Sequence, residues 1–234
     1  MYAASVDGQR LIFDVAGVYR RNMIIRDRQT GTLWQHATGE ALMGPLQGAR
    51  LQVLGGELTR WSGWQEMNPR TTLAVEPVPD NGRYPGLIPR HRLEHMLEIF
   101  TTNYAAPGLI TDKRLPMHEE IAGLSLAGVD RAYPLALLRE QIVINDNIGE
   151  HAIAILYDAD ADHVLALERQ LGDKTIDLVP TGGGLSSTGG MRWTWTGQPL
   201  TDETPPLQQI WIERQWWLGW VEFHPASEVY QAPI

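Results

Sequence analysis

Short runs of alternating apolar and polar residues, separated by glycine and turn residues, dominate the chain and predict a β-rich fold. The first such runs are Leu11–Val18 and Asn22–Arg26, and from Thr32 to Val53 short apolar groups continue between glycines. Alternation with a period of two places successive side chains on opposite faces of a strand. We therefore expect antiparallel hairpins up to Val53.

The same kind of pattern returns in the second part of the chain. Strands are expected at Ile121–Leu126, Arg131–Tyr133, Ile142–Ile144, Ala152–Tyr157, Val164–Arg169, Thr175–Val179 and Met191–Thr196. A short helix is expected over Pro134–Arg139, because proline is tolerated at the first helical position. The glycine-rich run Thr181–Gly190 lacks the Gly-Lys-Ser/Thr ending of a phosphate-binding loop and precedes a β-leaning run. We expect it to be a long hairpin connection.

Two tryptophan-containing stretches interrupt the strand pattern and predict short helices. In WSGWQEMNP (Trp61–Pro69), the residues Trp61, Trp64 and Met67 are three apart and share one helix face, and the proline ends the helix. WLGWVEFHP (Trp217–Pro225) has the same design. Large apolar side chains at helical spacing favour a core role, so we expect the indoles of both stretches to fill the core.

These two stretches form one of two pairs of repeated segments. Trp, Gly, Trp, Glu and Pro recur with an offset of 217 − 61 = 156 residues, and Thr30–Leu42 recurs as Thr188–Leu200 with an offset of 188 − 30 = 158. Two repeats with nearly equal offsets indicate an internal duplication. We therefore expect an α+β, β-rich protein of two homologous hairpin-built halves related by pseudo-twofold symmetry, each closed by a short Trp-bearing helix.

The expected division of the chain is unequal. The first repeat spans 1–75 and is expected to be shortened at its start. A proline- and glycine-rich connector with one helix (Pro89 to about Phe100) spans 76–115, and the second repeat, expected to be complete, spans 116–234. The hairpins from Ile121 to Thr175 have no counterpart in the first repeat. A shortened half leaves a sheet edge that needs cover. We therefore expect a second copy of the chain or a partner chain to complete the first repeat.

Composition and charge exclude several classes of function. With 43% hydrophobic and 20% charged residues the chain has an ordinary globular composition. Its net charge is −9 and its arginines do not gather in a stripe, which argues against nucleic-acid binding. The absence of cysteine excludes disulfides, thiolate metal sites and cysteine nucleophiles. The sequence shows no signal peptide at its start and no apolar run long enough to span a membrane.

Several segments resemble a bacterial and archaeal family known as domain of unknown function 3179. The matching stretches are Arg26–Gly48, Trp61–Pro69, Arg114–Leu135, Ile144–Gly149 and Trp216–Tyr230. The resemblance implies a two-copy layout, with the opening part of the first copy missing here, and it brings no established activity. In many relatives the tyrosine matching Tyr157 precedes a Cys-x-x-Cys pair, whereas this chain continues with Asp-Ala-Asp-Ala. Relatives are often extracytoplasmic, and the localisation of this chain is left unknown.

A zinc site is one candidate for chemistry. His91, Glu94 and His95 fit the H-x-x-E-H pattern, in which two histidines one helical turn apart bind zinc and the glutamate acts as a base. The third ligand would have to be a distant carboxylate such as Glu168. The alternative, which we favour, is an exposed charged helix face in the connector.

A calcium site is the second candidate. Asp158, Asp160 and Asp162 imitate the start of a calcium-binding loop, but His163 and Arg169 stand where the loop needs glycine and glutamate. A solvated hairpin tip explains these acids more simply. The cofactor is therefore left unknown, with neither zinc nor calcium favoured.

The two tryptophan helices also suggest a ligand groove. Glu66 and Glu222 each lie two positions after the second tryptophan and point away from the indole face, where they would hold an arginine of the other half or line a shared groove. Trp61 and Trp217 are aromatic surfaces on which a flat ligand would stack. A groove at the pseudo-twofold axis is thus the first place to expect a ligand.

Taken together, these residues favour an uncharacterised β-rich binding or interaction module without evident catalytic machinery. The alternatives are a metal-dependent enzyme that uses His91 and His95, or a degenerate relative of a thiol-redox protein. The residues leave open whether the chain is an enzyme.

Overall fold

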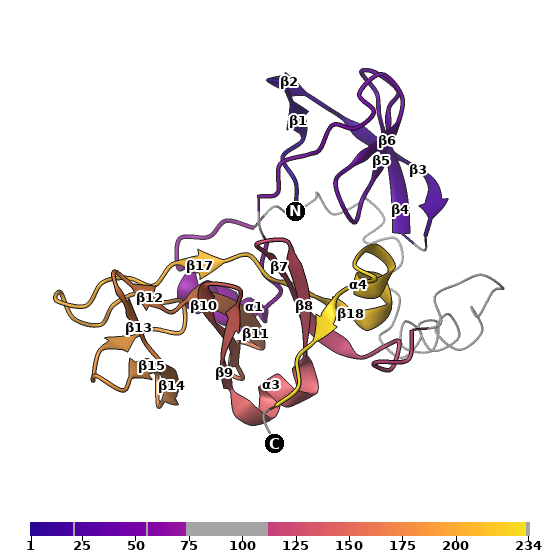
Figure 1. Ribbon diagram of the computed structural model, residues 1–234. Helices are drawn as coiled ribbons and strands as arrows, with labels where there is room; N and C mark the ends of the chain where they lie inside the picture. The colour runs from indigo at the N-terminus through magenta and orange to yellow at the C-terminus, as the bar shows by residue number, and fades with distance from the viewer. Residues whose placement is uncertain (21, 55, 74–111, 233–234) are drawn as a thin grey trace, which may run out of the picture.

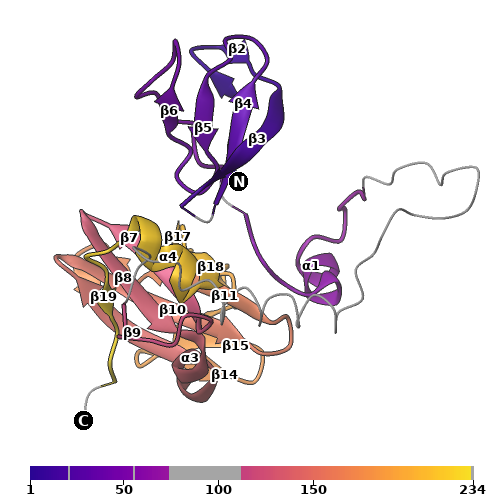
Figure 2. The same cartoon turned by 90° about the vertical axis from the view of Figure 1, so that its right-hand side faces the viewer.

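The computed structural model describes residues 1–20, 22–54, 56–73 and 112–232. Within these residues the chain forms two lobes (Figure 1). The N-terminal lobe (residues 1–54) holds strands β1 (Ser5–Val6) to β6 (Ala41–Met43), and the larger lobe (residues 112–232) holds the later strands. Helix α1 (Trp61–Met67) follows the N-terminal lobe in sequence but lies beside the larger lobe (Figure 2). The backbone N–H of Arg60, just before the helix, donates to the carbonyl oxygen of Ala161 at 2.8 Å.

The main sheet of the N-terminal lobe has four antiparallel strands in chain order. β3 (Phe13–Tyr19) pairs with β4 (Asn22–Asp27), β4 with β5 (Leu33–Gln35), and β5 with β6. The strands predicted at Leu11–Val18 and Asn22–Arg26 are confirmed, with their ends shifted by one or two residues. β1 and β2 (Gln9–Arg10) form a separate two-stranded ribbon.

Trp34 is the centre of the N-terminal core. Its side chain is fully buried and packs with Leu11, Ala41 and Leu51. Its indole Nε1 donates a hydrogen bond of 2.9 Å to Oδ2 of the buried Asp27, and the backbone N–H of Thr30 donates to Oδ1 at 2.6 Å. A carboxylate is tolerated in a core only where such bonds replace water. Asp27 therefore ties the central tryptophan to the turn between β4 and β5.

Acid is expected to weaken the N-terminal lobe through Asp27. Burial raises the pKa of its carboxyl group, but the hydrogen bonds from Trp34, Thr30 and Thr32 together outweigh burial and hold the pKa below its ordinary value of 3.8. Such a group stabilises the fold above its unfolded pKa, and this contribution is lost as the pH falls through the folded pKa. The free energy of unfolding should therefore fall more steeply below about pH 4 for the wild type than for Asp27→Asn, in urea titrations at a series of pH values. Equal slopes would contradict this role.

Two four-stranded sheets form the larger lobe. The first has the order β18 (Glu213–Trp216), β7 (Glu120–Leu126), β8 (Val129–Pro134) and β19 (Glu228–Val229), with β19 parallel to β8 and the other pairs antiparallel. The second is antiparallel, in the order β17 (Gln209–Ile210), β11 (His163–Glu168), β10 (His151–Asp158) and β9 (Val143–Ile148). Helix α3 (Leu135–Gln141) directly follows β8, where the sequence predicted a helix.

Strand β10 lies between two hydrophobic cores. Ile153 and Ile155 pack into one core together with Leu135 and Leu138 of α3, while the alternating residues, such as Leu156, pack into the other. Successive side chains of a strand point to opposite faces. The continuous apolar run of β10 therefore shows that both faces of this sheet are covered.

The glycine-rich run contains a strand that the sequence analysis did not expect. After the small hairpin of β12 (Gln170–Leu171) and β13 (Lys174–Thr175), β14 (Leu178–Thr181) turns into β15 (Gly184–Ser187), which pairs with β16 (Arg192–Trp193). The long hairpin connection expected over Thr181–Gly190 therefore contains a paired strand of its own. A Cβ atom at Gly184 would collide with the carbonyl oxygen of Trp193, so glycine here permits a close approach of two strands.

Helices α1 and α4 (Trp217–Phe223) form where the tryptophan spacing predicts them, but they are packed very differently. Trp217 and Trp220 of α4 are at most 1% exposed and pack with Ile121 of β7, whereas Trp61 of α1 is 49% exposed and Trp64 is half-buried. The core role expected for all the indoles is therefore wrong for Trp61. Helical spacing shows which residues share a face, but the cover for that face must come from another element.

The described part of the chain is β-rich, with the three short helices α1, α3 and α4, which confirms the β-rich character expected from the sequence. No helix in that part is long and apolar enough to cross a membrane. The division into repeats at 1–75 and 116–234 stays a prediction. The connector helix expected from Pro89 to Phe100 lies outside the described residues.

Candidate functional site

The zinc candidate cannot be placed in the fold. His91 and His95 lie outside the described residues, so this site stays a prediction. Glu168, the suggested third ligand, is the last residue of β11, and its carboxylate lies 4.0 Å from His151 Nδ1. In the described ranges 1–73 (without 21 and 55) and 112–232, no group of three His, Asp or Glu side chains is arranged to hold a metal ion.

The calcium candidate lies at the turn between β10 and β11, as expected for a hairpin tip. Asp158 Oδ1 accepts hydrogen bonds from the backbone N–H groups of Asp160 (3.0 Å) and Ala161 (3.2 Å). Asp162 instead accepts a hydrogen bond of 2.8 Å from the Tyr157 hydroxyl group and lies 3.1 Å from Arg214. These bonds direct the carboxylates of Asp158 and Asp162 to different partners, the turn and an arginine.

The four residues of the predicted ligand groove lie in different surroundings. Trp61 and Glu66 are exposed on α1. Trp217 is buried, its indole Nε1 donates to Asp112 at 3.3 Å, and a guanidinium group stacks 5.0 Å from its ring. Glu222 is nearly buried on α4 and lies 4.0 Å from Arg20 Nε of the N-terminal lobe. Contact with an arginine of the other half is one of the two roles that the sequence suggested for Glu222.

A cavity between the two lobes is the strongest candidate site in the described part of the chain. Its volume is about 850 Å³. The N-terminal lobe and the segment that follows it supply one wall, which includes Tyr2, His36 and Glu57. The opposite wall comes from β11, β17, β18 and the end of α4. Residues from distant parts of the sequence thus face one space.

His163 forms the buried part of this cavity wall. Its side chain is 2% exposed, and Nε2 lies 3.6 Å from Glu57 Oε2. Its Nδ1 atom is buried and has no hydrogen-bond partner among the described residues. Burial lowers the pKa of the imidazole, against the opposing effect of the carboxylates of Glu57 and Asp158. The ring is therefore neutral at neutral pH.

His224 is held by its neighbours at the C-terminal end of α4. Its ring stacks on the Trp220 indole, with ring centres 3.8 Å apart and an angle of 16° between the planes. Its Nδ1 atom lies 2.9 Å from Asp130 Oδ2. The stack on the indole and the contact with Asp130 together fix the orientation of the imidazole ring.

Glu213 and Arg214, adjacent on β18, contribute opposite charges to the cavity wall. Burial raises the pKa of Glu213, and the effects of His224 and the Trp211 side chain, which lower it, do not compensate. Arg214 Nη2 donates to Glu120 Oε1 at 3.1 Å, and Arg214 also lies 3.1 Å from the carboxylate of Asp162. Two carboxylates therefore neutralise the arginine, whereas Glu213 forms no ion pair with a described residue.

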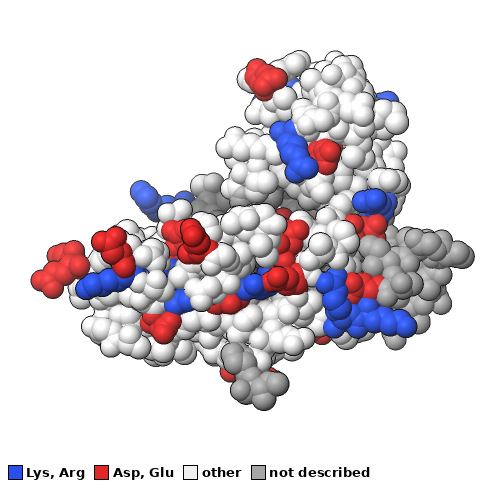
Figure 3. Space-filling view, in the orientation of Figure 1, with Lys and Arg blue, Asp and Glu red and all other residues white. Residues whose placement is uncertain are grey.

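Sequence reasoning did not identify this cavity. His163 stands in the sequence only as a departure from the calcium-loop pattern, and Glu57, Glu213 and Arg214 belong to no recognised motif. The surface charge does not point to the cavity either, because acidic and basic side chains are interspersed over the face of the larger lobe seen in Figure 3. The cavity depends on how the two lobes meet, which local spacing does not encode.

Comparison with known proteins supports the family resemblance. The family model described as protein of unknown function (DUF3179) matches residues 1–227. No curated protein and no solved structure matches the chain.

Proposed function

The chain belongs to the DUF3179 family, and from that premise we propose that it is a binding module whose ligand occupies the cavity between its two lobes. The observation that carries the proposal is a cavity of about 850 Å³ lined by ionisable and aromatic side chains from both lobes. Small-molecule sites have volumes of about 300–1,000 Å³ and combine apolar walls with a few polar groups. The cavity falls within this range.

Binding is favoured over catalysis by the way the ionisable groups of the cavity are held. Arg214 is neutralised by two carboxylates, and His163 is buried beside Glu57. The chain contains no cysteine, so a thiol nucleophile is excluded. The metal-dependent alternative through His91 and His95 stays a prediction, as does descent from a thiol-redox protein.

We also propose that the two halves descend from one duplicated unit. The hydrogen bonds around the two tryptophan helices support this. Trp64 Nε1 donates to Thr71 Oγ1 at 2.9 Å, and Trp220 Nε1 donates to Ser227 Oγ at 2.7 Å, in each case seven residues further on. The residue after each helix also donates its backbone N–H to the carbonyl oxygen of the same tryptophan. A shared origin accounts for the same bonds at the same spacing.

The second pair of repeated segments supports the same proposal. The backbone N–H of Leu51 donates to the carbonyl oxygen of Gly39, and that of Leu207 donates to Gly197, both at 2.9 Å. Both glycines have a positive φ, of 69° and 79° respectively, which favours glycine at this turn. The proposed pseudo-twofold relation predicts that one rotation superposes both pairs of segments in experimental coordinates. Failure to superpose them would contradict it.

A second copy of the chain is the partner that we propose for the N-terminal lobe. β3 is the edge strand of its sheet, and its side chains Val15 and Val18 are 71% and 76% exposed. An open strand edge with apolar side chains favours association with another strand. Light scattering after gel filtration is expected to show a dimer that Val18→Lys weakens. A monomer at every concentration would contradict self-association and leave a different chain as the partner.

The binding proposal is tested with a library of small fragments of mixed charge, followed by ligand-observed NMR. Leu58 lines the cavity and is 60% exposed, so Leu58→Trp should obstruct the opening without disturbing a core. Leu200 is 48% exposed and lies outside the cavity lining, which makes Leu200→Trp the matched control. We expect fragments that bind the wild type and Leu200→Trp equally and bind Leu58→Trp at least about 10-fold more weakly. The proposal fails if no fragment binds, or if Leu58→Trp binds as well as the control.

A further inference from the structure

We infer that the ligand of the cavity is an organic cation, with an ammonium or guanidinium group that pairs with the carboxylate of Glu213. The inference rests on the binding function proposed above and adds the chemical class of the ligand. It depends on three observations: the condition of Glu213, the charge balance of the cavity, and the aromatic side chains in its wall.

Glu213 is a desolvated acid that has no ion-pair partner among the described residues. Its carboxyl group accepts a hydrogen bond of 3.0 Å from the Gln215 amide and one from the Trp211 side chain. Neither donor carries a charge, and no Lys, Arg or His nitrogen of the described residues lies within ion-pair distance of it. A half-buried carboxylate in this condition is stabilised by any cation that reaches it. The cavity gives a ligand that access.

Among the described residues, most of the remaining charges near Glu213 are paired or neutral. Arg214, the adjacent residue, is paired with Glu120 and Asp162, and His163 is kept neutral by burial. Glu57 adds a second carboxylate to the wall. His224 and the Met1 amine act on Glu213 from beyond ion-pair distance, and they do not bring its pKa down to the ordinary value. The local field therefore favours a cationic ligand over an anionic one.

Aromatic side chains complete the site. Tyr2, Trp211 and Phe223 line the same cavity as Glu213, and Trp211 is 38% exposed. Aromatic faces attract organic cations through their quadrupoles and also cover the apolar body of such a ligand. A carboxylate beside several aromatic rings suits an amine with an apolar body better than a metal ion or a sugar.

The test uses three probes of similar size and different charge: phenethylamine, phenethyl alcohol and phenylpropionate. Binding to the full chain is measured by calorimetry at neutral pH. We expect phenethylamine to bind at least about 10-fold more tightly than either other probe, because a charge-assisted hydrogen bond to a desolvated carboxylate exceeds a neutral one by about that factor.

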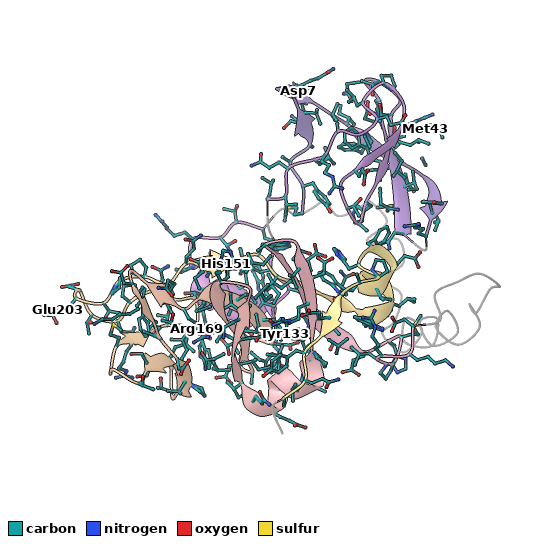
Figure 4. The ribbon with its side chains drawn as sticks, viewed as in Figure 1. Asp7, Met43, Tyr133, His151, Arg169 and Glu203 are labelled. Carbon is teal, nitrogen blue, oxygen red and sulfur yellow. The ribbon has the colours of Figure 1, made fainter. Side chains whose placement is uncertain are left out.

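Two variants assign the preference to Glu213. Glu213→Gln removes the charge but keeps an oxygen that can accept the Gln215 hydrogen bond, and it should reduce phenethylamine affinity about 10-fold without weakening phenethyl alcohol. Glu203→Gln removes the same charge from an exposed loop far from the cavity (Figure 4) and should leave all three affinities unchanged. Equal losses in both variants would mean that the net charge of the chain sets the preference, which overturns the inference.

The outcomes separate this inference from the binding function. If phenethyl alcohol or phenylpropionate binds as tightly as the amine, the cationic class is wrong and the binding function stands. The cationic class is also wrong, and the binding function also stands, if Leu58→Trp blocks the binding of library fragments and none of these fragments is an amine. If neither probes nor fragments bind, both proposals fail.

Discussion

Trp220→Ala is expected to lower the free energy of unfolding by about 3–5 kcal/mol, as large aromatic truncations in well-packed cores do. Trp220 is 1% exposed, and its indole Nε1 donates a hydrogen bond of 2.7 Å to Ser227. Its ring lies against Gly123 of β7 so closely that a Cβ atom there would collide with it. Truncation therefore leaves a cavity and removes the indole donor from the Ser227 hydroxyl group, which keeps only its own hydrogen bond to the carbonyl oxygen of Glu228. Urea denaturation followed by circular dichroism measures the loss.

The equivalent substitutions in α1 are the matched controls. Trp64 makes the corresponding hydrogen bond to Thr71 but is half-buried, so Trp64→Ala should cost about 1–2 kcal/mol. Trp61 is 49% exposed, and Trp61→Ala should change stability by no more than about 0.5 kcal/mol. Equal losses for Trp61→Ala and Trp220→Ala would mean that both helices are covered alike, which contradicts the exposure of Trp61 and the burial of Trp220.

Arg169→Met should destabilise the protein by about 3–5 kcal/mol, because it removes a buried charge that several acceptors share. Arg169 is 4% exposed and lies inside the larger lobe (Figure 4). Its guanidinium group donates to the carbonyl oxygens of Ile153 (2.8 Å), Ile176 (2.8 Å) and Asp146 (3.1 Å), and to Asp177. Without the arginine these carbonyl groups lose their donor in a region with little access to water.

Substitution of the partner tests whether the ion pair or the carbonyl contacts account for the loss. The Asp177 side chain is 66% exposed, so Asp177→Asn should cost less than about 1 kcal/mol. Arg169→Lys keeps the positive charge, but an ammonium group lacks the planar fork of a guanidinium and cannot reach all of the separate carbonyl groups. Its loss of stability should lie between those of Arg169→Met and Asp177→Asn. If Asp177→Asn were as damaging as Arg169→Met, the ion pair would be the main contribution and this explanation would be wrong.

Local pattern predicted many of the elements, and its failures have identifiable causes. The positions of β3, β4, α1 and α4 followed from spacing and turn residues, because those signals act within a few residues. The sequence did not predict β15, because Gly184, which lets this strand approach β16, is also a residue type typical of loops. The predicted groove residues Glu66 and Glu222 lie on helices with different surroundings, so their shared sequence context does not give them a shared environment.

The sequence by itself determined that the chain is β-rich, that two short tryptophan helices interrupt its hairpins, and that its chemistry excludes thiols, because these properties depend on composition and on neighbours along the chain. Only the tertiary structure decided that Trp217 is buried while Trp61 is exposed, and that Glu57, His163 and Glu213 face one cavity. The physical reason is that burial and desolvation depend on which element covers a residue. For these residues the cover comes from segments far away in the sequence.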